Sequence, residues 1–370
     1  MSARWAWAEV DLGAVRHNVA HLRAVVAPAE LWAVVKADGY GHGAVHVARA
    51  ALDAGAFGLC VALASEGAEL RRHGIVAPVL LLSEQPMEEL AAVVAEQLES
   101  TVYSSRQIEA LSAEVRGARH RVHLKVDTGM HRVGCDPCDA LALARSIVSD
   151  RALVLAGVCT HLAVADDPTD PFTATQLAAF DAVLAELREA EIDPGEVHVA
   201  NSAGALAHPM ARRSFVRVGI AMYGISPGAG VADLAGVLRP ALALRARVSY
   251  VRRVVAGERV SYGLRHRFAT ATTVATVPLG FADGVPRRLF ETAAEVLVGG
   301  RRCRIVGVVT MDQLMVDVGD LSVAVGDDVV LIGAQGDERI TAEEWAERLG
   351  TIGYEVVCGV SKRIERRTRS

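Results

Sequence analysis

The sequence predicts an α/β protein in which an eight-stranded (β/α)8 barrel is followed by a mainly β domain. Short apolar segments alternate with helical patterns over roughly the first 235 residues, which is about the size of such a barrel. After that point the chain changes to short β-rich segments broken by Gly and Asp. We therefore expect a barrel domain at residues 1–235 and a mainly β domain at residues 236–370.

The barrel strands are predicted where short apolar runs are bounded by turn residues. These runs are Leu31–Val35, Phe57–Ala62, Ala77–Leu82, Ser100–Tyr103, Val122–Val126, Leu153–Thr160, Val197–Ala200 and Phe215–Val218. Helical patterns separate most of them, for example Met87–Leu98, Ser105–Val115, Cys138–Val148 and Thr173–Glu189. A doubly wound parallel sheet is the alternative, but the count of eight and the absence of Gly-x-Gly-x-x-Gly favour the barrel.

The first residues of the chain look like a strand that stands apart from the barrel. Trp5–Leu12 alternates in polarity, and Asp11 is placed to cap a helix from Leu12. We expect residues 1–11 to join the C-terminal domain. Strands of that domain are predicted at Leu242–Val255, Thr272–Val277, Glu295–Val298, Arg304–Val309, Leu314–Val318 and Asp328–Ile332, with a helix at Ala342–Leu349. The pair Gly299-Gly300 predicts a hairpin turn.

Charge and composition exclude several classes of function. The net charge is −5, and the basic block Lys362–Arg369 lies at the terminus, which argues against nucleic acid as a partner. The N-terminus lacks the pattern of a signal peptide and no apolar stretch is long enough to cross a bilayer, so we expect a cytoplasmic protein. Cys135 and Cys138 have the spacing of a metal or redox pair, but no second ligand pair lies nearby, and we predict no metal site.

A lysine closes the first predicted barrel strand. Lys36 follows the buried run Leu31–Val35 and precedes a glycine-rich loop and a helix over Ala44–Leu52. Such a lysine can form a Schiff base with a carbonyl cofactor, or it can simply extend from the strand end to solvent. A phosphate-binding loop is a third interpretation, but Gly-x-x-x-x-Gly-Lys is absent.

Polar residues also close other strands, where barrels collect their functional groups. They include Tyr40 in the first loop, Lys125, Asp127 and Arg132 after the fifth strand, His161 after the sixth, Asn201 and Ser202 after the seventh, and Arg217 in the eighth. Barrels often bind phosphate at the loops after strands seven and eight, here at Ser202 and at Gly219-Ile220. A phosphate there and an amine at Lys36 together indicate a phosphorylated aldehyde, and pyridoxal phosphate fits both ends.

Other polar and aromatic residues have simpler interpretations. We expect His42, His46, His123 and His131 to be loop or surface residues, and Trp5, Trp7 and Trp32 to serve packing. Asp38 and Asp127 are expected to cap turns or helices.

Seven segments, in order, resemble the alanine racemases, which are barrel-fold pyridoxal phosphate enzymes. They are Ala33-Val-Val-Lys36-Ala-Asp-Gly-Tyr40-Gly-His-Gly43, Leu124-Lys125-Val-Asp-Thr-Gly-Met-His-Arg132-Val-Gly, Ala200-Asn-Ser202, Arg217-Val-Gly219-Ile220-Ala-Met-Tyr223-Gly, Val260-Ser-Tyr262-Gly, Gly307-Val-Val-Thr-Met311-Asp312-Gln and Gly353-Tyr354-Glu-Val. The resemblance covers nearly the whole chain and includes the C-terminal domain.

The resemblance implies two proton-transfer groups on opposite faces of the substrate α-carbon. Lys36 would hold the cofactor and serve one face, and Tyr262 of a second subunit would serve the other. Arg217 would face the pyridine nitrogen in a network with His161. Because arginine stays protonated, it would donate to a neutral ring nitrogen and weaken the ring as an electron sink.

The remaining roles concern the phosphate and the substrate. Tyr40, Ser202, Gly219, Ile220 and Tyr354 match the phosphate contacts of the family. Arg132 would pair with the substrate carboxylate, and Met311 would add a backbone N–H from the second subunit. Lys125 matches a lysine that many relatives carry as a carbamate, and Asp312 is expected near the substrate mouth.

The expected activity is the interconversion of L- and D-alanine by a homodimer, which would supply D-alanine for peptidoglycan. One departure keeps alternatives open, because Phe281 stands where the family usually has a tyrosine at the inner entrance. The alternatives are a racemase of serine or of a secondary-metabolism substrate, a fold-related decarboxylase, and a non-catalytic pyridoxal phosphate carrier. Arg217 and Tyr262 disfavour the decarboxylase, and the C-terminal domain disfavours the carrier.

Overall fold

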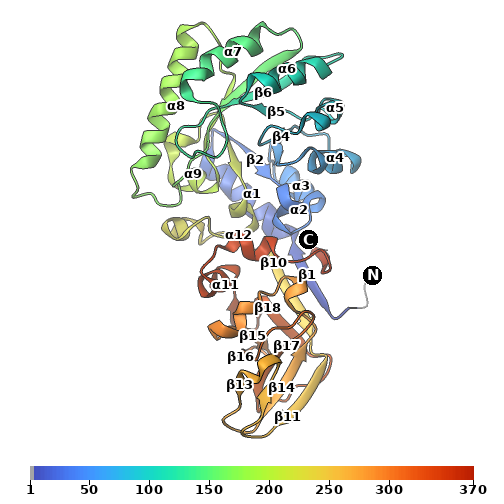
Figure 1. Ribbon diagram of the computed structural model, residues 1–370. Coiled ribbons are helices and arrows are strands. Elements are labelled where there is room, and N and C mark those ends of the chain that lie inside the picture. The colour runs from blue at the N-terminus through green and yellow to red at the C-terminus, as the bar shows by residue number, and fades with distance from the viewer. Residues whose placement is uncertain (1–3) are drawn as a thin grey trace. The chain divides into compact units, whose positions relative to one another are not determined.

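The computed structural model describes residues 4–370 of the chain, which fall into two compact units. The barrel unit contains Val15–Gly39 and Ala44–Leu238. The sheet unit contains the residues up to Ala14, Tyr40–Gly43 and Arg239–Ser370. Both units are drawn in Figure 1, and each is described here by itself.

The barrel unit is built on eight parallel strands. They are β2 (Glu30–Val34), β3 (Gly58–Val61), β4 (Val79–Leu81), β5 (Ser100–Val102), β6 (His120–Lys125), β7 (Leu153–Cys159), β8 (Glu196–His198) and β9 (Phe215–Val218). They form two four-stranded sheets, in the orders β4-β3-β2-β9 and β5-β6-β7-β8. All eight predicted barrel strands are therefore confirmed.

Backbone hydrogen bonds join the two four-stranded sheets into one barrel. On one side Glu99 bridges to Leu80 in parallel register, and its N–H donates to the Val79 carbonyl at 2.8 Å. On the other side the N–H of Arg217 donates to the Ala200 carbonyl at 3.0 Å. Because parallel strands are staggered and close on themselves, their carboxyl ends all meet at one end of the barrel.

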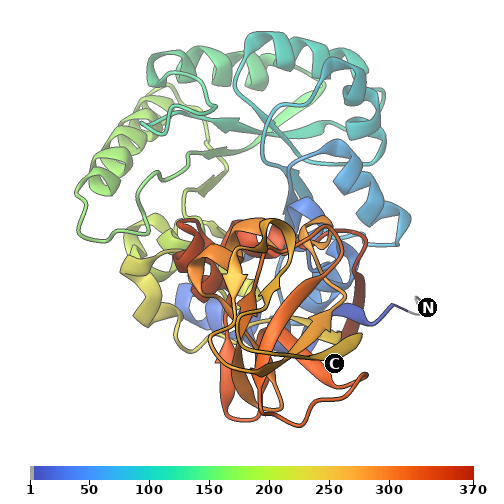
Figure 2. The same ribbon diagram turned by 60° about the horizontal axis from the view of Figure 1, so that its bottom comes forward.

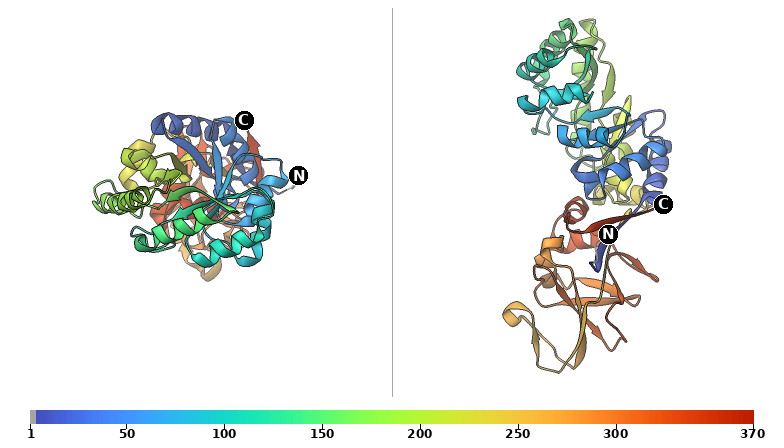
Figure 3. Two further views of the ribbon diagram at one scale, coloured as in Figure 1. Left: turned by 90° about the horizontal axis from the view of Figure 1, so that it is seen from above. Right: turned by 90° about the vertical axis from the view of Figure 1, so that its right-hand side faces the viewer.

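Helices cover the outside of these strands, as Figure 2 and the left view of Figure 3 show. They are α1 (Leu12–Val26), α3 (Ala44–Asp53), α4 (Ala64–Arg72), α5 (Leu90–Ala95), α6 (Ser105–Glu114), α7 (Ala140–Ser149), α8 (Phe172–Glu189), α9 (Ser202–Ala207) and α10 (Ala232–Ala235). Short 3-10 turns add η1 (Met87–Glu89), η2 (Pro137–Asp139), η3 (Pro209–Ala211), η4 (Ile220–Tyr223) and η5 (Ala229–Val231). The predicted cap is confirmed, because Asp11 Oδ1 accepts the N–H of Ala14 at 2.8 Å.

The interior of the barrel contains an aromatic stack as well as aliphatic side chains. Trp32 on β2 stacks on Phe215 of β9 with 4.7 Å between ring centroids. Phe215 in turn stacks on the imidazole of His198, with 4.2 Å between centroids. Trp32 is confirmed as a packing residue, being 1% exposed. Most of these strands are buried on both faces and are therefore short apolar runs, whereas β6 and β8 also carry polar side chains.

The sheet unit is dominated by a ten-stranded sheet whose main path is β11-β14-β17-β16-β15-β18-β10-β1-β20, with β19 paired to β18. Its strands are β1 (Ala6–Asp11), β10 (Leu242–Arg247), β11 (Tyr250–Val254), β14 (Thr272–Val277), β15 (Glu295–Val298), β16 (Arg301–Val306), β17 (Leu314–Gly319), β18 (Asp328–Gln335), β19 (Glu338–Ile340) and β20 (Glu365–Arg369). A separate ribbon pairs β12 (Arg259–Val260) with β13 (His266–Arg267). The helices are α11 (Ala342–Leu349) and α12 (Gly353–Cys358), with 3-10 turns η6 (Tyr262–Leu264), η7 (Phe281–Asp283) and η8 (Arg287–Thr292).

The first strand of the chain lies in this sheet and not in the barrel. β1 runs antiparallel to β10 and parallel to β20, which comes from the other end of the chain. The hairpin predicted at Gly299-Gly300 joins β15 to β16, and both glycines have positive φ angles.

One prediction in this unit was too long and others were missed. The run Leu242–Val255 is two strands and not one, because the chain changes partners at Val248 and Ser249. Val248 donates to the Asp327 carbonyl and Ser249 donates to the Thr276 carbonyl, so β10 and β11 pair with different strands. The helix α12 and the strands β19 and β20 were not predicted, since each is too short to show a clear period.

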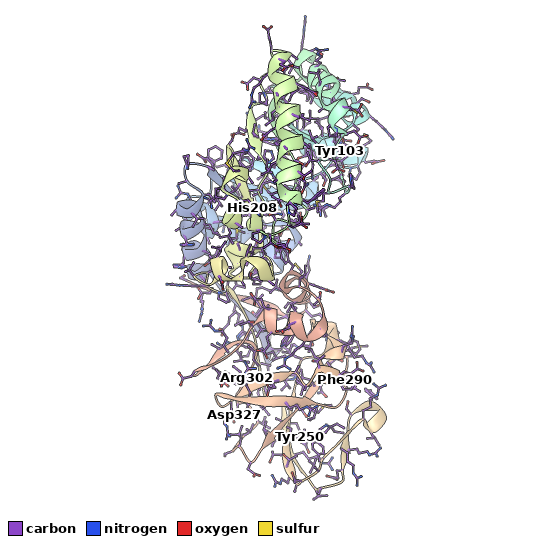
Figure 4. The ribbon with its side chains drawn as sticks, turned by 90° about the vertical axis from the view of Figure 1, so that its left-hand side faces the viewer. Tyr103, His208, Tyr250, Phe290, Arg302 and Asp327 are labelled. Carbon is purple, nitrogen blue, oxygen red and sulfur yellow. The ribbon has the colours of Figure 1, made fainter. Side chains whose placement is uncertain are left out.

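An ion-pair network holds α11 to the sheet. Arg302 on β16, labelled in Figure 4, pairs with Glu295, Glu338 and Glu344 at 2.8–3.3 Å. Arg348 joins the same network through Glu344 at 3.1 Å. Networks of this kind contribute more than isolated surface pairs, because one ordered guanidinium serves several carboxylates.

Two further observations concern the whole described chain. Within residues 4–370, no helix combines the length and the apolar character that a membrane crossing requires. All six cysteines are free thiols, with Cys135 buried and Cys138 exposed.

Candidate active site

Lys36 stands directly after β2, at the start of a left-handed turn that Figure 1 labels α2 (Lys36–Tyr40). Ala37, Asp38 and Gly39 all have φ angles of 52–61°. Left-handed geometry costs about 1–2 kcal/mol for each residue with a Cβ. Ala37 and Asp38 both bear this cost, whereas Gly39 does not, so this glycine-rich loop is strained. Asp38 compensates as a cap, as predicted, because its Oδ1 accepts the N–H of Ala44 at 2.9 Å.

Arg217 lies on β9, in the strand next to Lys36. The two strands pair in parallel register, with Trp32 opposite Arg217 and Ala33 opposite Val218. The guanidinium is buried and donates only to neutral acceptors. These acceptors are His198 Nδ1 at 2.5 Å, the Thr160 carbonyl at 2.9 Å, the Val199 carbonyl at 3.0 Å and His161 Nδ1 at 3.3 Å.

The two histidines beside Arg217 are held in their neutral form. Burial lowers the pKa of His161 and of His198 well below the usual value, and the positive charge of Arg217 lowers both further. Since arginine donates hydrogen bonds and accepts none, each Nδ1 that faces it must be an unprotonated acceptor. Both imidazoles therefore carry their proton on Nε2.

Positive charge dominates this end of the barrel. Burial and the charges of Arg217, Arg132 and Lys36 together lower the pKa of Lys125 to about 8, with a small opposing effect of Cys159. Burial also raises the pKa of the Cys60 and Cys159 thiols, so neither supplies a negative charge. Among residues 4–370, no carboxylate forms an ion pair with Arg217. A cationic cluster without matching anions is suited to an anionic ligand.

Ser202 and the loop after β9 meet at the same end of the barrel unit. Ser202 opens α9, whose cap is Asn201, with Oδ1 accepting the N–H of Gly204 at 2.9 Å. The Ser202 hydroxyl accepts the backbone N–H of Gly219 at 2.9 Å and of Ala221 at 3.4 Å. Ile220 begins η4 between them. The two segments predicted to bind phosphate are therefore in direct contact.

Arg132 is exposed in the segment that follows β6 in the barrel unit. The remaining predicted site residues belong to the sheet unit. The rings of Tyr40 and Tyr354 lie 6.1 Å apart between centroids at a tilt of 50°, which brings their phenols into one region of that unit. Gly41, next to Tyr40, packs so closely on the Val357 carbonyl that a Cβ would collide with it. Glycine at position 41 thus lets the loop approach α12.

Tyr262 projects from a strained turn on the surface of the sheet unit. Ser261, Gly263 and Leu264 all have positive φ angles, and the Ser261 hydroxyl donates to the Val308 carbonyl at 2.7 Å. The Tyr262 side chain is 73% exposed. This hydrogen bond holds the turn, while the Tyr262 phenol faces outward from the sheet unit.

Met311 and Phe281 lie side by side in a second surface segment of this unit. The N–H of Phe281 donates to the Thr310 carbonyl at 2.9 Å, and that of Ala282 donates to the Met311 carbonyl at 3.0 Å. Phe281 itself is 42% exposed, so its ring is presented at the surface of the unit. The turn is fixed below by the fully buried Asp283, which forms two 2.6 Å hydrogen bonds with Arg4.

Asp312 is next to Met311 and pairs with Arg363 at 2.8 Å. The carboxylate is half-exposed, and Arg363 also approaches the buried carboxylate of Asp283 at 3.6 Å. Asp312 is thus one end of an ion-pair chain at the surface of the sheet unit.

One histidine prediction is wrong, because His123 is fully buried in a strand. His42 lies in the loop between α2 and α3 as predicted, although its ring is buried, and His46 and His131 are exposed. His123 lies on β6 with its ring inside the barrel, and His42 Nδ1 lies 2.9 Å from the Tyr40 carbonyl. Of the three tryptophans expected to serve packing, Trp7 is buried but Trp5 is 40% exposed.

His198 was not singled out from the sequence, although it is the nearest side-chain partner of Arg217. A signal was available in the strand period. Glu196 and His198 are alternate residues of β8, and Arg121, His123 and Lys125 are alternate residues of β6. Alternate residues of a strand lie on one face, so His123 shares the face of Lys125, and His198 shares that of Glu196.

Comparisons with known proteins agree with this geometry. The family model for the N-terminal domain of alanine racemase matches residues 10–227, and the model for the C-terminal domain matches residues 241–368. The alanine racemase of Symbiobacterium thermophilum is 50% identical and covers 97% of this chain and 96% of its own length. That of Desulforamulus reducens is 43% identical, covering 97% and 98%.

Solved structures give the same result for the fold. The crystal structure of alanine racemase from Bacillus anthracis with bound L-Ala-P matches with a TM-score of 0.94 and 38% identity, and the match covers 100% of this chain and 96% of that one. The enzyme from E. faecalis matches with a TM-score of 0.93 and 39% identity, covering 99% and 98%. These similarities extend over both the barrel unit and the sheet unit.

Proposed function

This chain belongs to the alanine racemase family, and from that premise we propose how it interconverts L-alanine and D-alanine with pyridoxal phosphate. The chain contains three lysines. Two of them, Lys36 and Lys125, contribute with Arg217 to the cationic cluster at one end of the barrel, and the third is exposed in the tail. A chain that otherwise uses arginine for its positive charges keeps lysine where an amine is chemically distinct from a guanidinium. That placement is the observation that carries the proposal.

The residues present fit pyridoxal phosphate. Lys36 would bind the aldehyde carbon through its amine, and Arg217 would donate to the ring nitrogen. The Ser202 hydroxyl and the N–H groups of Gly219 and Ile220 would hold the phosphate, because these groups already meet in one place. The same proposal gives Tyr40 and Tyr354 roles as hydroxyl donors to the phosphate.

When it is bound, the cofactor stabilises negative charge on the substrate α-carbon by delocalising it into the ring. Arg217 limits that delocalisation, since a guanidinium donates a hydrogen bond to the ring nitrogen without transferring its proton. Its neutral neighbours His161 and His198 orient the guanidinium and cannot protonate the ring in its place. Limited delocalisation favours return of a proton to the α-carbon over side reactions.

Two bases are required, because racemisation removes a proton from one face of the α-carbon and returns one to the other. We assign one face to the Lys36 amine and the opposite face to the phenol of Tyr262 of the partner subunit. The strained, outward-facing turn that presents Tyr262 supports an action on a second subunit. Arg132 would pair with the substrate carboxylate, and the Met311 N–H of the partner subunit would contact the substrate.

A homodimer follows from the same assignment. Three large apolar or aromatic side chains, Tyr262, Leu264 and Met311, are 73%, 53% and 56% exposed on the sheet unit. Patches of exposed aromatic and apolar side chains are more common at protein interfaces than on the rest of the protein surface. A two-fold dimer would use each such surface twice and so complete two equivalent sites.

Lys125 is proposed to carry a carbamate. A carbamate forms only from a neutral amine, and burial together with three neighbouring cations lowers the Lys125 pKa to about 8. The modification would replace a positive charge beside Arg132 with a negative one. It would therefore orient the Arg132 guanidinium, which an unmodified ammonium would repel.

The proposed function is tested by α-deuterium exchange on a panel of amino acids in heavy water. The purified holoenzyme should exchange and racemise alanine in both directions, and release no carbon dioxide. The panel should include serine and larger amino acids, because Phe281 replaces the usual tyrosine of the family and lies at the surface beside Met311. The proposal fails if another amino acid is turned over faster than alanine, or if the cofactor binds without any α-proton exchange.

A further inference from the structure

A cluster of polar and charged side chains, with His123 and Glu99 buried and Arg121 and Glu196 partly exposed, lies among β5, β6 and β8 of the barrel. Glu99 precedes β5, and its Oε2 lies 2.8 Å from Nε2 of His123 on β6. Its other oxygen accepts from Arg121 Nε at 2.8 Å, and Arg121 also reaches Glu196 on β8 at 3.3 Å. His123 is fully buried and Glu99 is 8% exposed. None of these residues has a role in the proposed reaction.

Hydrogen bonds connect this cluster to Arg217 without a break. His123 Nδ1 lies 3.0 Å from His198 Nε2, and His198 Nδ1 lies 2.5 Å from the Arg217 guanidinium. Three hydrogen bonds thus join the Glu99 carboxylate to the Arg217 guanidinium through two imidazole rings.

The direction of every bond in this chain is determined by its two ends. Arg217 can only donate, so His198 Nδ1 accepts and His198 Nε2 carries the proton. That proton is donated to His123 Nδ1, which leaves the His123 proton on Nε2, facing Glu99. Both imidazoles are then neutral, with a carboxylate at one end of the chain and a guanidinium at the other.

The packing around the rings leaves them little freedom to turn. His198 is stacked on Phe215, and His123 meets His198 edge-on with 5.0 Å between centroids. Gly157 on β7 lies opposite His123, where a Cβ would come within 2.5 Å of Nδ1. A β-bulge between Val122 and His123 in the β6–β7 pairing brings this glycine into register. The missing side chain of Gly157 thus leaves space for the His123 ring where that ring contacts both Glu99 and His198.

We propose that Glu99 is the counter-charge and positioning residue of Arg217, and that it acts through His123 and His198. The inference rests on the proposed function of Arg217 at the cofactor ring. A buried guanidinium without a carboxylate partner is costly, and a carboxylate in direct contact would neutralise the group that faces the ring. A carboxylate two imidazoles away stabilises the charge, fixes the direction of donation and leaves the remaining guanidinium surface positive.

A metal ion is the competing interpretation of this cluster. Ligand atoms of Glu99, His123 and Glu196 lie within 4.8 Å of one another. The guanidinium of Arg121, however, already bridges the two carboxylates, and both nitrogens of His123 are engaged. The Arg121 guanidinium therefore already supplies the positive charge at this cluster, which favours the hydrogen-bonded chain over a metal site.

The test compares two matched variants of the holoenzyme, Glu99→Gln and Glu196→Gln. Both remove a carboxylate from Arg121, but only the first changes the group that faces His123. Glutamine at position 99 keeps an acceptor for the His123 proton and removes the charge. We expect Glu99→Gln to lower kcat for alanine about tenfold with KM changed less than twofold, because a charge-assisted hydrogen bond becomes a neutral one. Glu196→Gln should stay within twofold of the parent.

The visible absorption band of bound pyridoxal phosphate provides a second readout, since it responds to the group at the ring nitrogen. The band should shift in Glu99→Gln and remain unchanged in Glu196→Gln. Equal kcat values and equal spectra in the two variants would overturn the proposal. Equal losses in both variants, together with zinc binding to the parent that both variants lack, would overturn it in favour of a metal site.

If Glu99→Gln does not fold, the proposal can still be tested by a measurement on the parent enzyme. Nitrogen-15 NMR of histidine-labelled enzyme at neutral pH should show the His123 and His198 rings as neutral imidazoles protonated on Nε2. An imidazolium or an Nδ1-protonated ring at His198 would contradict the chain. This result does not depend on racemisation, so failure of the proposed function and failure of this inference are distinguishable.

Discussion

The distribution of lysine shows how strongly single residues define this protein. Lys36 and Lys125 stand near each other and near Arg217, whereas Lys362 is exposed in the tail. An arginine at position 36 or 125 would keep the charge but could not lose its proton in the accessible pH range. Both proposed roles require an amine that can become neutral, which explains why arginine would not serve.

Carbamylation of Lys125 can be tested directly. The neutral fraction of an amine with a pKa of about 8 rises from about a tenth at pH 7 to about nine-tenths at pH 9. With ¹³C-bicarbonate we expect a carbamate signal that grows over this pH range and is absent from Lys125→Arg. Because the chain has only three lysines, a signal that persisted in that variant would assign the carbamate to another amine.

The Tyr262 phenol is expected to serve one face of the α-carbon only. Tyr262→Phe should lower racemisation of alanine by about a hundredfold or more, which is the usual contribution of a general acid–base group. Cofactor binding should be unchanged, and one enantiomer should still exchange its α-proton for deuterium through Lys36. Full racemisation by this variant would exclude Tyr262 as a base.

The sequence pointed to several polar residues at or near the ends of barrel strands and missed partners that lie within the strands. Lys36, Lys125, Ser202 and Arg217 were singled out because polar groups at the ends of barrel strands are informative. His123 lies two residues before Lys125 on the same face of β6 and is buried, which contradicts the prediction of a loop or surface residue. A lone histidine in a sequence has no visible partner, and its partners here come from residues 99 and 198.

At the scale of elements, a glycine in β7 decides whether the buried histidine chain can exist. A methyl group on Gly157 would come within 2.5 Å of His123 Nδ1 and would also collide with the Glu196 carbonyl. We expect Gly157→Ala to destabilise the protein by about 1–3 kcal/mol through overpacking. Gly117 has open space around its Cβ position, so Gly117→Ala is the matched control and should change stability by less than about 0.5 kcal/mol.

Urea unfolding followed by circular dichroism measures both variants. A Gly157→Ala protein as stable as the parent would mean that the strands shift to accept the methyl group. In that case the position of His123 is less restricted than the packing indicates.

For the whole molecule, buried neutral histidines predict loss of stability in acid. Burial lowers the pKa of His120 to about 4, and burial together with Arg217 lowers those of His161 and His198. Each folded-state pKa lies below the unfolded value near 6.5, so the unfolded chain binds protons first as the pH falls. The free energy of unfolding should therefore decrease below about pH 6.5, by about 3 kcal/mol from His120 alone when pH 4 is reached.

Glu99 adds to this loss at lower pH. Burial opposes its ionisation, but hydrogen bonds from His123 and Arg121 hold its pKa below the usual value, so its contribution disappears as the pH falls through that lowered pKa. Urea unfolding at a series of pH values checks the slope. His120→Gln should flatten the curve between pH 6.5 and 4, while His46→Gln at an exposed position should leave it unchanged.

Assembly is the second property of the whole molecule that can be tested. Lys36→Ala and Tyr262→Phe should each be inactive alone, but a refolded equal mixture should recover about a quarter of parental activity. Half of the dimers would then be mixed, and each mixed dimer would have one site with an intact lysine from one chain and an intact tyrosine from the other. If both bases came from a single chain, the mixture would recover nothing.

The sequence by itself determined the (β/α)8 class, the eight strands, the family and the residues at the strand ends. These follow from local period, turn residues and ordered motifs, which a chain displays before it folds. The tertiary structure alone decided the left-handed turn at Lys36, the exchange of strand partners at Val248, and the buried chain from Glu99 to Arg217. The last two features depend on contacts between residues far apart in the sequence, such as His123 with His198 and Val248 with Asp327, and on the space that a neighbour such as Gly157 leaves open.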